Sequence, residues 1–316
     1  MTERLTPDDL FERRLSYPDR DAAKRFERLV GIDEAKARLT KLLSILVNPG
    51  GLEAWAKRHH SDAGLLLGYV ARKPPLVVLA GDVGSGKTEL AESIGDPVAR
   101  QEGISVTLYP LSLSARGTGV VGEMTHLISA AFAATIEAAE KVARGGKKSS
   151  GAVILLVDEA DSLTESRANQ HMHHEDRAGV NAFIRGVDRL AQKRLPAAVI
   201  LCTNRLSAID PAVRRRAAEL FEFGRPNAEQ RRTVLAPPLL ELGFTDMQIA
   251  KVVELTGSRN GDSTRFTFSD LTQRFLPMLV LDAYPDHAIT FERATRVAMG
   301  IQPTPVFGRT ASAQEQ

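Results

Sequence analysis

The feature that most constrains this chain is the segment Gly81-Asp82-Val83-Gly84-Ser85-Gly86-Lys87-Thr88, which matches the phosphate-loop pattern G-x-x-x-x-G-K-[ST] in full. An apolar run, Leu76–Ala80, precedes it, and a helical pattern that begins near Lys87 follows it. Glycines let the backbone N–H groups of such a loop point inward around phosphates, and the helix N-terminus adds partial positive charge. The segment therefore predicts a strand, a loop and a helix that together bind the phosphates of a nucleotide.

Within this segment, residue types suggest individual roles. Lys87 is expected to reach the β- and γ-phosphate oxygens of ATP, and Thr88 to offer its hydroxyl to Mg²⁺. We expect cofactor contacts along the whole stretch, from Gly81 through Thr88 to Glu89. The alternative is a glycine turn that matches the pattern by chance, and the flanking strand and helix argue against it.

Short apolar runs alternate with helical patterns between Pro74 and Phe223, which predicts an α/β fold. Most runs are rich in Val, Ile and Leu, as strands buried on both faces are. The expected fold is that of a P-loop NTPase, a parallel five-stranded sheet with helices on both faces, followed by a small helical lid domain. The five expected strands are Leu76–Ala80, Ser105–Leu111, Ala152–Val157, Ala197–Thr203 and Leu220–Phe223.

Helical patterns follow one another after Gly224-Arg225-Pro226, with Thr245 and Thr290 as expected N-caps and a kink expected at Pro277. The expected lid helices are Ala228–Leu235, Asp246–Thr256, Ser269–Tyr284 and Thr290–Met299. The chain thus divides into an N-terminal segment, the nucleotide-binding domain, the lid and a tail expected to be mobile, with bounds 1–27, 28–225, 226–301 and 302–316.

Polar residues follow two of the expected strands. Val153–Val157 runs directly into Asp158 and Glu159, and two carboxylates at the end of a buried strand are costly unless they face a cation or a reaction. We expect Asp158 to hold Mg²⁺ and Glu159 to polarise the attacking water as general base. Asn204 follows another strand and is expected to help orient that water, although an Asx turn closing the strand is compatible with the same position.

The composition limits which partners and which cellular compartment we expect for this chain. Lys and Arg number 41 against 39 for Asp and Glu, so no overall field favours nucleic acid or an anionic membrane. The single cysteine, Cys202, lies in an apolar run and fits a reducing cytoplasm. The N-terminus shows no signal-peptide pattern, and no apolar stretch is long enough to span a bilayer.

The segment Asp210-Pro211-Ala212-Val213-Arg214-Arg215-Arg216 resembles the stretch that follows the sensor asparagine in AAA+ ATPases. The resemblance implies a ring, usually a hexamer, in which an arginine of this stretch reaches the neighbouring subunit's nucleotide. Arg215 is the first choice and Arg216 the second, and a solvated basic run is the alternative. Upstream, Leu29–Lys36 resembles the family's adenine-side segment, in which Val30, Gly31 and Ile32 would contact the base.

The chain departs from the family in the lid. The arginine that commonly begins a lid helix is absent, because the region reads Phe268-Ser269-Asp270-Leu271. Arg274 or Arg265 would have to substitute for it in contacting ATP.

A glycine-rich segment, Gly117–Glu123, falls where protein-remodelling members of the family carry the pore loop that grips a substrate chain. Val120 and Val121 would supply an aliphatic grip, and an ordinary glycine-rich loop is the alternative. The histidines His171, His173 and His174 lie where a second pore loop would be expected. No cysteine or paired carboxylate lies in register with them, so a polar or pH-sensitive loop is preferred over a zinc site.

Several segments together resemble the HORMA-domain-remodelling, pachytene-checkpoint type of AAA+ ATPase: Leu156–Leu163, Val180–Phe183, Val187–Leu190, Arg215–Ala218 and Leu276–Leu279. The resemblance implies a HORMA-domain protein as substrate and, in a bacterium, control of a HORMA-regulated antiphage nucleotide-signalling system. Residues 1–27 are too few for the adaptor-binding domain of eukaryotic relatives. The substrate would then be recognised by the ring or by this short segment.

Three other classes of protein were weighed. A DNA-acting AAA+ loader or motor predicts a basic stripe or an added winged helix, and the balanced charge argues against it. ATP-dependent proteolysis would need a protease motif such as HExxH, which is absent from the sequence. A nucleotide switch without hydrolysis would be expected to lack Glu159 or Lys87, and both are present.

Overall fold

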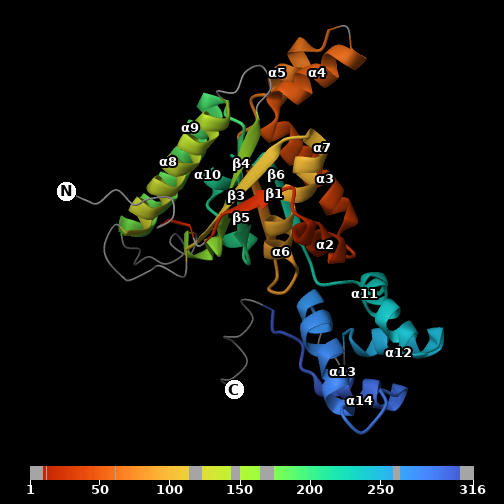
Figure 1. Cartoon of the computed structure of the whole chain (residues 1–316). Coiled ribbons are helices and arrows are strands. Elements are labelled where there is room, and N and C mark those ends of the chain that lie inside the picture. Colours follow the sequence, from red (N-terminus) through yellow and green to blue (C-terminus); the bar gives the residue numbers. More distant parts are fainter. Residues whose placement is uncertain are drawn as a thin grey trace. The chain divides into compact units, whose positions relative to one another are not determined.

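The computed structural model describes residues 10–11, 13–60, 62–113, 123–143, 150–163, 174–258 and 264–306. The chain divides into two compact units (Figure 1). The first unit spans Met1–Glu27, Glu34–Ala80 and Thr88–Glu222, and the second spans Arg28–Asp33, Gly81–Lys87 and Phe223–Gln316. Most of the phosphate loop therefore belongs to the same unit as the C-terminal helices. The sheet lies in the first unit, except for Gly81 and Phe223, each of which is the last residue of a strand.

The sheet has six strands in the order β1-β3-β4-β5-β2-β6. The five strands expected from the apolar runs are all present, as β2 (Leu76–Gly81), β3 (Ser105–Ser112), β4 (Gly151–Asp158), β5 (Ala197–Thr203) and β6 (Glu219–Phe223). Pairing is parallel between β3 and β4, β4 and β5, and β2 and β5. The expected P-loop NTPase sheet is thus confirmed in its parallel core.

The expectation of five strands was one short. The sixth strand, β1 (Leu15–Tyr17), pairs antiparallel with β3, with Leu15 opposite Leu108 and Tyr17 opposite Val106. Three residues are too few to show an alternating pattern, so nothing in the sequence marked this strand.

Helices lie on both faces of the sheet. α8 (Glu123–Ala143) and α9 (His174–Lys193) lie on one face, and α3 (Asp33–Val47) and α7 (Gly95–Glu102) lie on the other (Figure 1). The remaining helices of this part of the chain are α2 (Arg20–Arg28), α4 (Pro49–His59), α5 (Gly64–Val70), α6 (Lys87–Ser93) and α10 (Pro211–Arg214), with short 3₁₀ turns η1 (Ala160–Leu163) and η3 (Leu206–Ala208).

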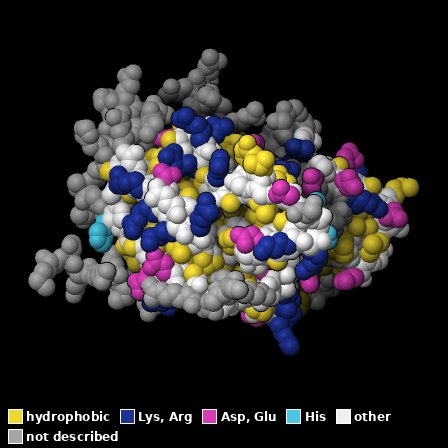
Figure 2. All heavy atoms as spheres, turned by 90° about the horizontal axis from the view of Figure 1, so that it is seen from above, with side chains coloured by type: hydrophobic (Ala, Val, Ile, Leu, Met, Phe, Trp, Pro, Cys, Tyr) yellow, Lys and Arg dark blue, Asp and Glu magenta, His cyan; other side chains and the backbone are white. Residues whose placement is uncertain are grey.

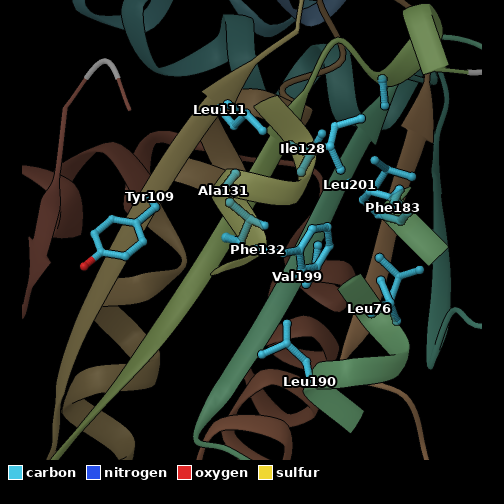
Figure 3. Packing of buried hydrophobic residues seen from close by; sticks show 14 of the residues in the cluster. Leu76, Tyr109, Leu111, Ile128, Ala131, Phe132, Phe183, Leu190, Val199 and Leu201 are labelled. Atoms are coloured by element: carbon cyan, nitrogen blue, oxygen red, sulfur yellow. The ribbon is translucent and has the colours of Figure 1, made fainter. Parts of the chain in front are cut away.

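The core under α8 and α9 follows the alternation of the strands. Leu76 on β2 and Val199 and Leu201 on β5 point to this face, where Phe132 of α8 and Phe183 of α9 pack edge to face (Figure 3). All five side chains are at most 2% exposed. Their burial, worth roughly 1.5–3 kcal/mol for each large apolar side chain, fixes the sheet that carries the site.

The N-terminal segment is fastened to this unit. Phe11 is 3% exposed and stacks on Tyr109 with ring centroids 4.6 Å apart. The hydroxyl of Tyr17 donates to the carbonyl oxygen of Glu92, and burial raises the pKa of that hydroxyl above its usual value. The described residues before Arg28 therefore pack on the first unit.

The second unit contains α11 (Ala228–Glu241), α12 (Asp246–Leu255), the π-helix η4 (Asp270–Phe275), α13 (Leu276–Ala283) and α14 (Phe291–Gly300). Thr245 and Thr290 cap α12 and α14 as expected. Two boundaries differ from expectation. α11 continues through Pro237 and Pro238, and the kink expected at Pro277 takes the form of a π-helix that ends where α13 begins.

The first residues of the segment after α14 are joined to η4 by hydrogen bonds. Thr304 donates its backbone N–H and its hydroxyl to the carboxylate of Asp270, at 3.0 and 2.7 Å. Burial alone would raise the pKa of Asp270, but hydrogen bonds from Thr267, Thr304 and Arg274 outweigh it and lower that pKa. A buried charged carboxylate thus joins η4 to the segment after α14.

Charged and hydrophobic side chains are mixed on the face shown in Figure 2, where Lys and Arg side chains lie beside hydrophobic ones and some carboxylates. Several exposed hydrophobic side chains belong to α5, where Leu65 is 87% and Tyr69 71% exposed. Within the described ranges, no helix combines the length and the apolar character needed to cross a membrane.

Candidate active site

The phosphate loop has the backbone that its glycines predict. Gly81, Gly84 and Gly86 have φ angles of +150°, +74° and +89°. Lys87, the first residue of α6, is 6% exposed, and its Nζ donates to the carbonyl oxygens of Gly81 (2.8 Å) and Asp82 (2.9 Å). Nζ also lies 3.3 Å from Oγ of Ser85. The ammonium group is therefore already directed into the loop, where a phosphate anion would find it.

Two loop glycines are required by close neighbours as well as by their φ angles. A Cβ on Gly81 would overlap the carbonyl oxygen of Phe223. A Cβ on Gly84 would come within 2.8 Å of Oγ1 of Thr267 and 2.9 Å of Cβ of Ser269. Any side chain at either position would push the loop away from these segments.

The expected adenine-side segment lies in the same unit as the loop. Gly31 has a φ of +79°, and its carbonyl oxygen accepts a hydrogen bond of 2.5 Å from Nε2 of Gln230. Val30 packs against the hydrophobic cluster of the lid, and Ile32 is half-buried. An ordered apolar segment of this kind suits the flat face of a base, and the base contact itself stays a prediction.

The second group of expected residues follows the strands of the first unit. The parallel register pairs Ala80 of β2 with Thr203 of β5, and Leu201 of β5 with Val157 of β4. The carboxyl ends of β2, β4 and β5 thus meet at one edge of the sheet, which is where ligands bind in open α/β sheets. Asp158 and Asn204 lie at this edge, both half-buried.

Glu159 follows Asp158 in a conformation that is unusual for a residue with a side chain. Its φ is +53°, in the left-handed region, and its backbone N–H donates to Oδ1 of Asp158 at 2.8 Å. Such strain costs about 1–3 kcal/mol and is concentrated at functional sites. The side chain of Glu159 is exposed, as a general base that meets a water molecule must be.

Asp161 is a residue of the site that sequence reasoning did not single out. Its carboxylate accepts from the hydroxyl of Thr203 (2.7 Å) and from the backbone N–H and the amide Nδ2 of Asn204 (3.1 and 3.2 Å). It also accepts from the backbone N–H of Arg205 at 3.1 Å. Asp161 therefore sets the orientation of Asn204, and the only signal for it in the sequence was its place just after the acidic pair.

The structure distinguishes the two candidate arginines. Arg216 makes a forked ion pair with Asp188 of α9, at 2.7 and 3.0 Å, and this hydrogen-bonded pairing raises the pKa of Arg216. Arg215 is exposed, and its Nε donates to the carbonyl oxygen of Pro211 over a long distance of 3.4 Å. The short helix α10 that carries both is capped by Asp210, whose side chain accepts from the N–H of Ala212.

The residues expected to hold Mg²⁺ fit that ion chemically. Thr88 is exposed and Asp158 half-buried, and both offer hard oxygen ligands. Among the described residues, no group of three His, Cys, Asp or Glu side chains could hold a metal by itself. A site with few protein ligands suits Mg²⁺, which keeps several waters and binds through substrate phosphates.

Other expected site residues have different surroundings. Glu89 lies 3.4 Å from Nη1 of Arg25. Arg274 pairs with Asp270 at 2.7 Å and donates to the carbonyl oxygen of Gln302 at 3.0 Å, so its guanidinium is engaged within the lid. Val120, Val121, His171 and His173 lie outside the described residues, and so does the side chain of His174.

Comparisons with known proteins show which family this chain resembles. The model of the family described as "ATPase family associated with various cellular activities (AAA)" matches residues 77–225. CD-NTase-associated protein 6 of Escherichia coli strain MS 115-1 is 59% identical over 300 residues, which cover 95% of this chain and 96% of that protein. A second protein of that name from Escherichia coli is 36% identical, over 96% of this chain and 99% of its own length.

Solved structures are also similar to this chain. A chain of the "Structure of E. coli MS115-1 HORMA:CdnC:Trip13 complex" superposes with a TM-score of 0.88 at 58% identity, covering 96% of this chain and 99% of that chain. Rhizobiales Trip13 superposes with a TM-score of 0.73 at 53% identity, over 93% and 99%. Caenorhabditis elegans PCH-2, at 18% identity and a TM-score of 0.62 over 90% and 73%, shares the fold.

Proposed function

The chain belongs to the AAA family of ATPases, within the group of the CD-NTase-associated proteins 6, and from this premise we propose that it couples ATP hydrolysis to remodelling of a HORMA-domain protein. One observation carries the proposal. This chain matches, over nearly its whole length, a chain of a solved complex whose other named members are HORMA and CdnC. In a bacterium the substrate would belong to a HORMA-controlled antiphage nucleotide-signalling system.

For the chemistry, the loop Gly81–Thr88 binds the phosphates of ATP, with the ammonium of Lys87 moving from loop carbonyls to phosphate oxygens. Thr88 and Asp158 would hold Mg²⁺, which when bound neutralises negative charge on the phosphates. Glu159 accepts the proton of the attacking water, and Asn204 orients that water under the control of Asp161.

The proposed assembly is a homo-hexameric ring. Arg215 of one subunit would reach the nucleotide of its neighbour and stabilise charge on the transferred phosphoryl group. The support is that Arg215 is exposed, whereas Arg216 is occupied by Asp188. In the ring, the segment containing Val120 and Val121 would line the pore and grip the substrate chain.

The proposal is tested by steady-state ATPase activity of the assembled protein, alone and with the HORMA protein of the solved E. coli complex. Three proteins are compared: the wild type, the Val120→Ala/Val121→Ala double variant, and Glu159→Gln as the inactive control. We expect the HORMA protein to stimulate the wild type and to change conformation, as followed by limited proteolysis. The double variant should keep its unstimulated rate and lose both effects.

The rival reading is an outcome of the same experiment. If the HORMA protein has no effect and double-stranded DNA stimulates hydrolysis, the remodelling proposal fails and a DNA-acting motor replaces it. If the double variant converts the HORMA protein at the wild-type rate, Val120 and Val121 are not the residues that grip the substrate chain.

A further inference from the structure

The phosphate loop is held from outside by one buried arginine. Arg225 lies just after β6, and its side chain is 7% exposed. Its Nε donates to Oδ2 of Asp82, the second residue of the phosphate loop, at 2.6 Å. The other carboxylate oxygen of Asp82 accepts from the N–H of Val83 at 3.1 Å. One carboxylate thus connects the arginine to the backbone of the loop.

The same arginine contacts the segment that leads into the lid helix η4. Its Nη1 donates to the carbonyl oxygen of Arg265 at 2.6 Å. Four residues further on, the backbone N–H of Ser269 donates to the carbonyl oxygen of Gly84 in the phosphate loop at 3.1 Å. The loop and the segment 264–269 are therefore joined at two points, of which Arg225 provides one.

The backbone around Arg225 is fixed as well. Pro226 follows it, and a residue before proline is restricted to extended conformations. The carbonyl oxygen of Pro226 accepts a hydrogen bond of 2.9 Å from Nη1 of Arg231, a side chain that is itself buried. On the other side, Phe223 lies against Gly81 so closely that only glycine fits. The backbone on both sides of Arg225 is thus held in place, so its side chain can fix the position of the loop.

The ion pair between Arg225 and Asp82 is largely shielded from solvent, so water cannot readily replace a lost partner. Asp82 has a side chain 14% exposed, and Nη2 of Arg225 is buried with no hydrogen-bond partner in the described part of the chain. Removing one member of a buried pair takes away the nearest opposite charge of the other, which is unfavourable. Loss of either side chain should therefore move the loop, because that is the part that can relax.

We propose that Arg225 is a positioning residue of the ATPase: through Asp82 it holds the phosphate loop in its binding shape, and through Arg265 it links that shape to the lid segment 264–269. Arg225 acts through the loop backbone and does not need to touch the nucleotide. The inference rests on the proposed role of the loop in binding ATP. It adds a residue outside the motif that determines how well the motif binds.

The test measures the Kd for a fluorescent ADP analogue and the ATPase kcat and KM of the full-length protein. Arg225→Ala should raise the Kd about tenfold or more, because a loop displaced by about 1 Å loses several N–H contacts to phosphate. Arg225→Lys, which keeps the charge but loses the fork to Arg265, should give an intermediate Kd. Asp82→Asn should resemble Arg225→Ala, and the Asp82→Asn/Arg225→Ala double variant should be no worse than either single variant.

A matched control separates positioning from general loss of stability. Arg293 pairs with Asp282 in the same unit at 2.8 Å, with side chains 22% and 25% exposed. Arg293→Ala should lower the Tm of the protein and leave the Kd for the ADP analogue unchanged. If Arg225→Ala does not fold, Asp82→Asn, which preserves the shape of the side chain, provides the same measurement.

The outcomes are distinct from failure of the proposed function. If Lys87→Ala loses nucleotide binding while Arg225→Ala and Asp82→Asn bind as tightly as the wild type, Arg225 has no positioning role and the ATP site stands. Additive losses in the double variant would also overturn the inference. If Lys87→Ala itself binds normally, the loop is not the nucleotide site and both ideas fail.

Discussion

The phosphate loop and the arginine segment differ in how the chain holds them. In the loop, the ammonium of Lys87 has three oxygen neighbours and Asp82 is paired with a buried arginine. In the arginine segment, Arg216 is fixed by Asp188, whereas Arg215 is exposed. The difference fits the proposed roles of the two cations: Lys87 would act on the nucleotide of its own chain, and Arg215 would act on that of a neighbouring subunit.

The largest effect is expected at the loop. Lys87→Ala should reduce ATP hydrolysis by about 10³-fold or more, since charged groups that contact the transferred phosphoryl are worth that much. Nucleotide binding should fall with it. Lys251→Ala, which removes a half-exposed lysine paired with Glu254 on α12, is the control and should hydrolyse ATP normally. Hydrolysis by the Lys87 variant within tenfold of the wild type would contradict the account of the loop.

The next effect is expected at the end of β4. Glu159→Gln should reduce kcat by about 10²- to 10³-fold, the range for removal of a general base, while ATP binding and assembly are retained. Turnover and nucleotide affinity measured on one preparation separate the two. Glu137→Gln, an exposed position on α8, should change neither. Equal hydrolysis by Glu159→Gln and the wild type would show that another group activates the water.

Substitution of the two arginines tests the comparison between the loop and the arginine segment most directly. Arg215→Ala should reduce hydrolysis by roughly 10²-fold or more with little change in the Tm, because its side chain is exposed and its contact with the carbonyl oxygen of Pro211 is long, at 3.4 Å. Arg216→Ala should do the reverse, with a modest loss of about 1 kcal/mol or less in stability and a near-normal rate, because it loses a half-exposed ion pair. If the two variants exchange these phenotypes, Arg216 is the residue that acts in the neighbouring subunit.

A smaller effect is expected at Asp161. Asp161→Ala removes an acceptor shared by Thr203, Asn204 and Arg205, which should lower stability by about 1–3 kcal/mol. The hydroxyl of Thr203 and the N–H of Arg205 keep their contacts with each other, so the N–H of Asn204 is most affected. With Asn204 no longer oriented, kcat should fall roughly tenfold while KM for ATP changes little. Urea unfolding and steady-state kinetics provide the two readouts. An unchanged kcat would mean that Asp161 only stabilises the turn after β5.

The sequence predicted those parts of the molecule that depend on local patterns. The five expected strands could be found because runs such as Val153–Val157 are buried on both faces, and the loop because its glycines and Lys87 occur at fixed spacings. β1 was not predicted because Leu15–Tyr17 is too short to show an alternating pattern. α11 was expected to end before Pro237, but it continues, since tertiary packing of Leu239 in the lid overrides local propensity.

The supporting residues could not be predicted because they depend on pairs distant in the chain. Arg225 meets Asp82 across 143 positions, and Asp161 meets Asn204 across 43. A charged residue in an ordinary position carries no signal of its partner until the fold brings the two together. The same holds for the arginines, where the sequence ranked Arg215 before Arg216 by alignment alone and the pairing of Arg216 with Asp188 could not be foreseen.

The measurement that tests the central claim most directly is the ATPase activity of a mixture of two inactive variants. Lys87→Ala subunits supply an intact Arg215 but no working loop, and Arg215→Ala subunits supply the reverse. If the site is completed by a neighbouring subunit, random mixing in equal amounts creates a complete site at about one quarter of the interfaces of a ring. The account predicts recovery of that order when the variants are assembled together. A mixture no more active than the sum of its separate components would contradict it.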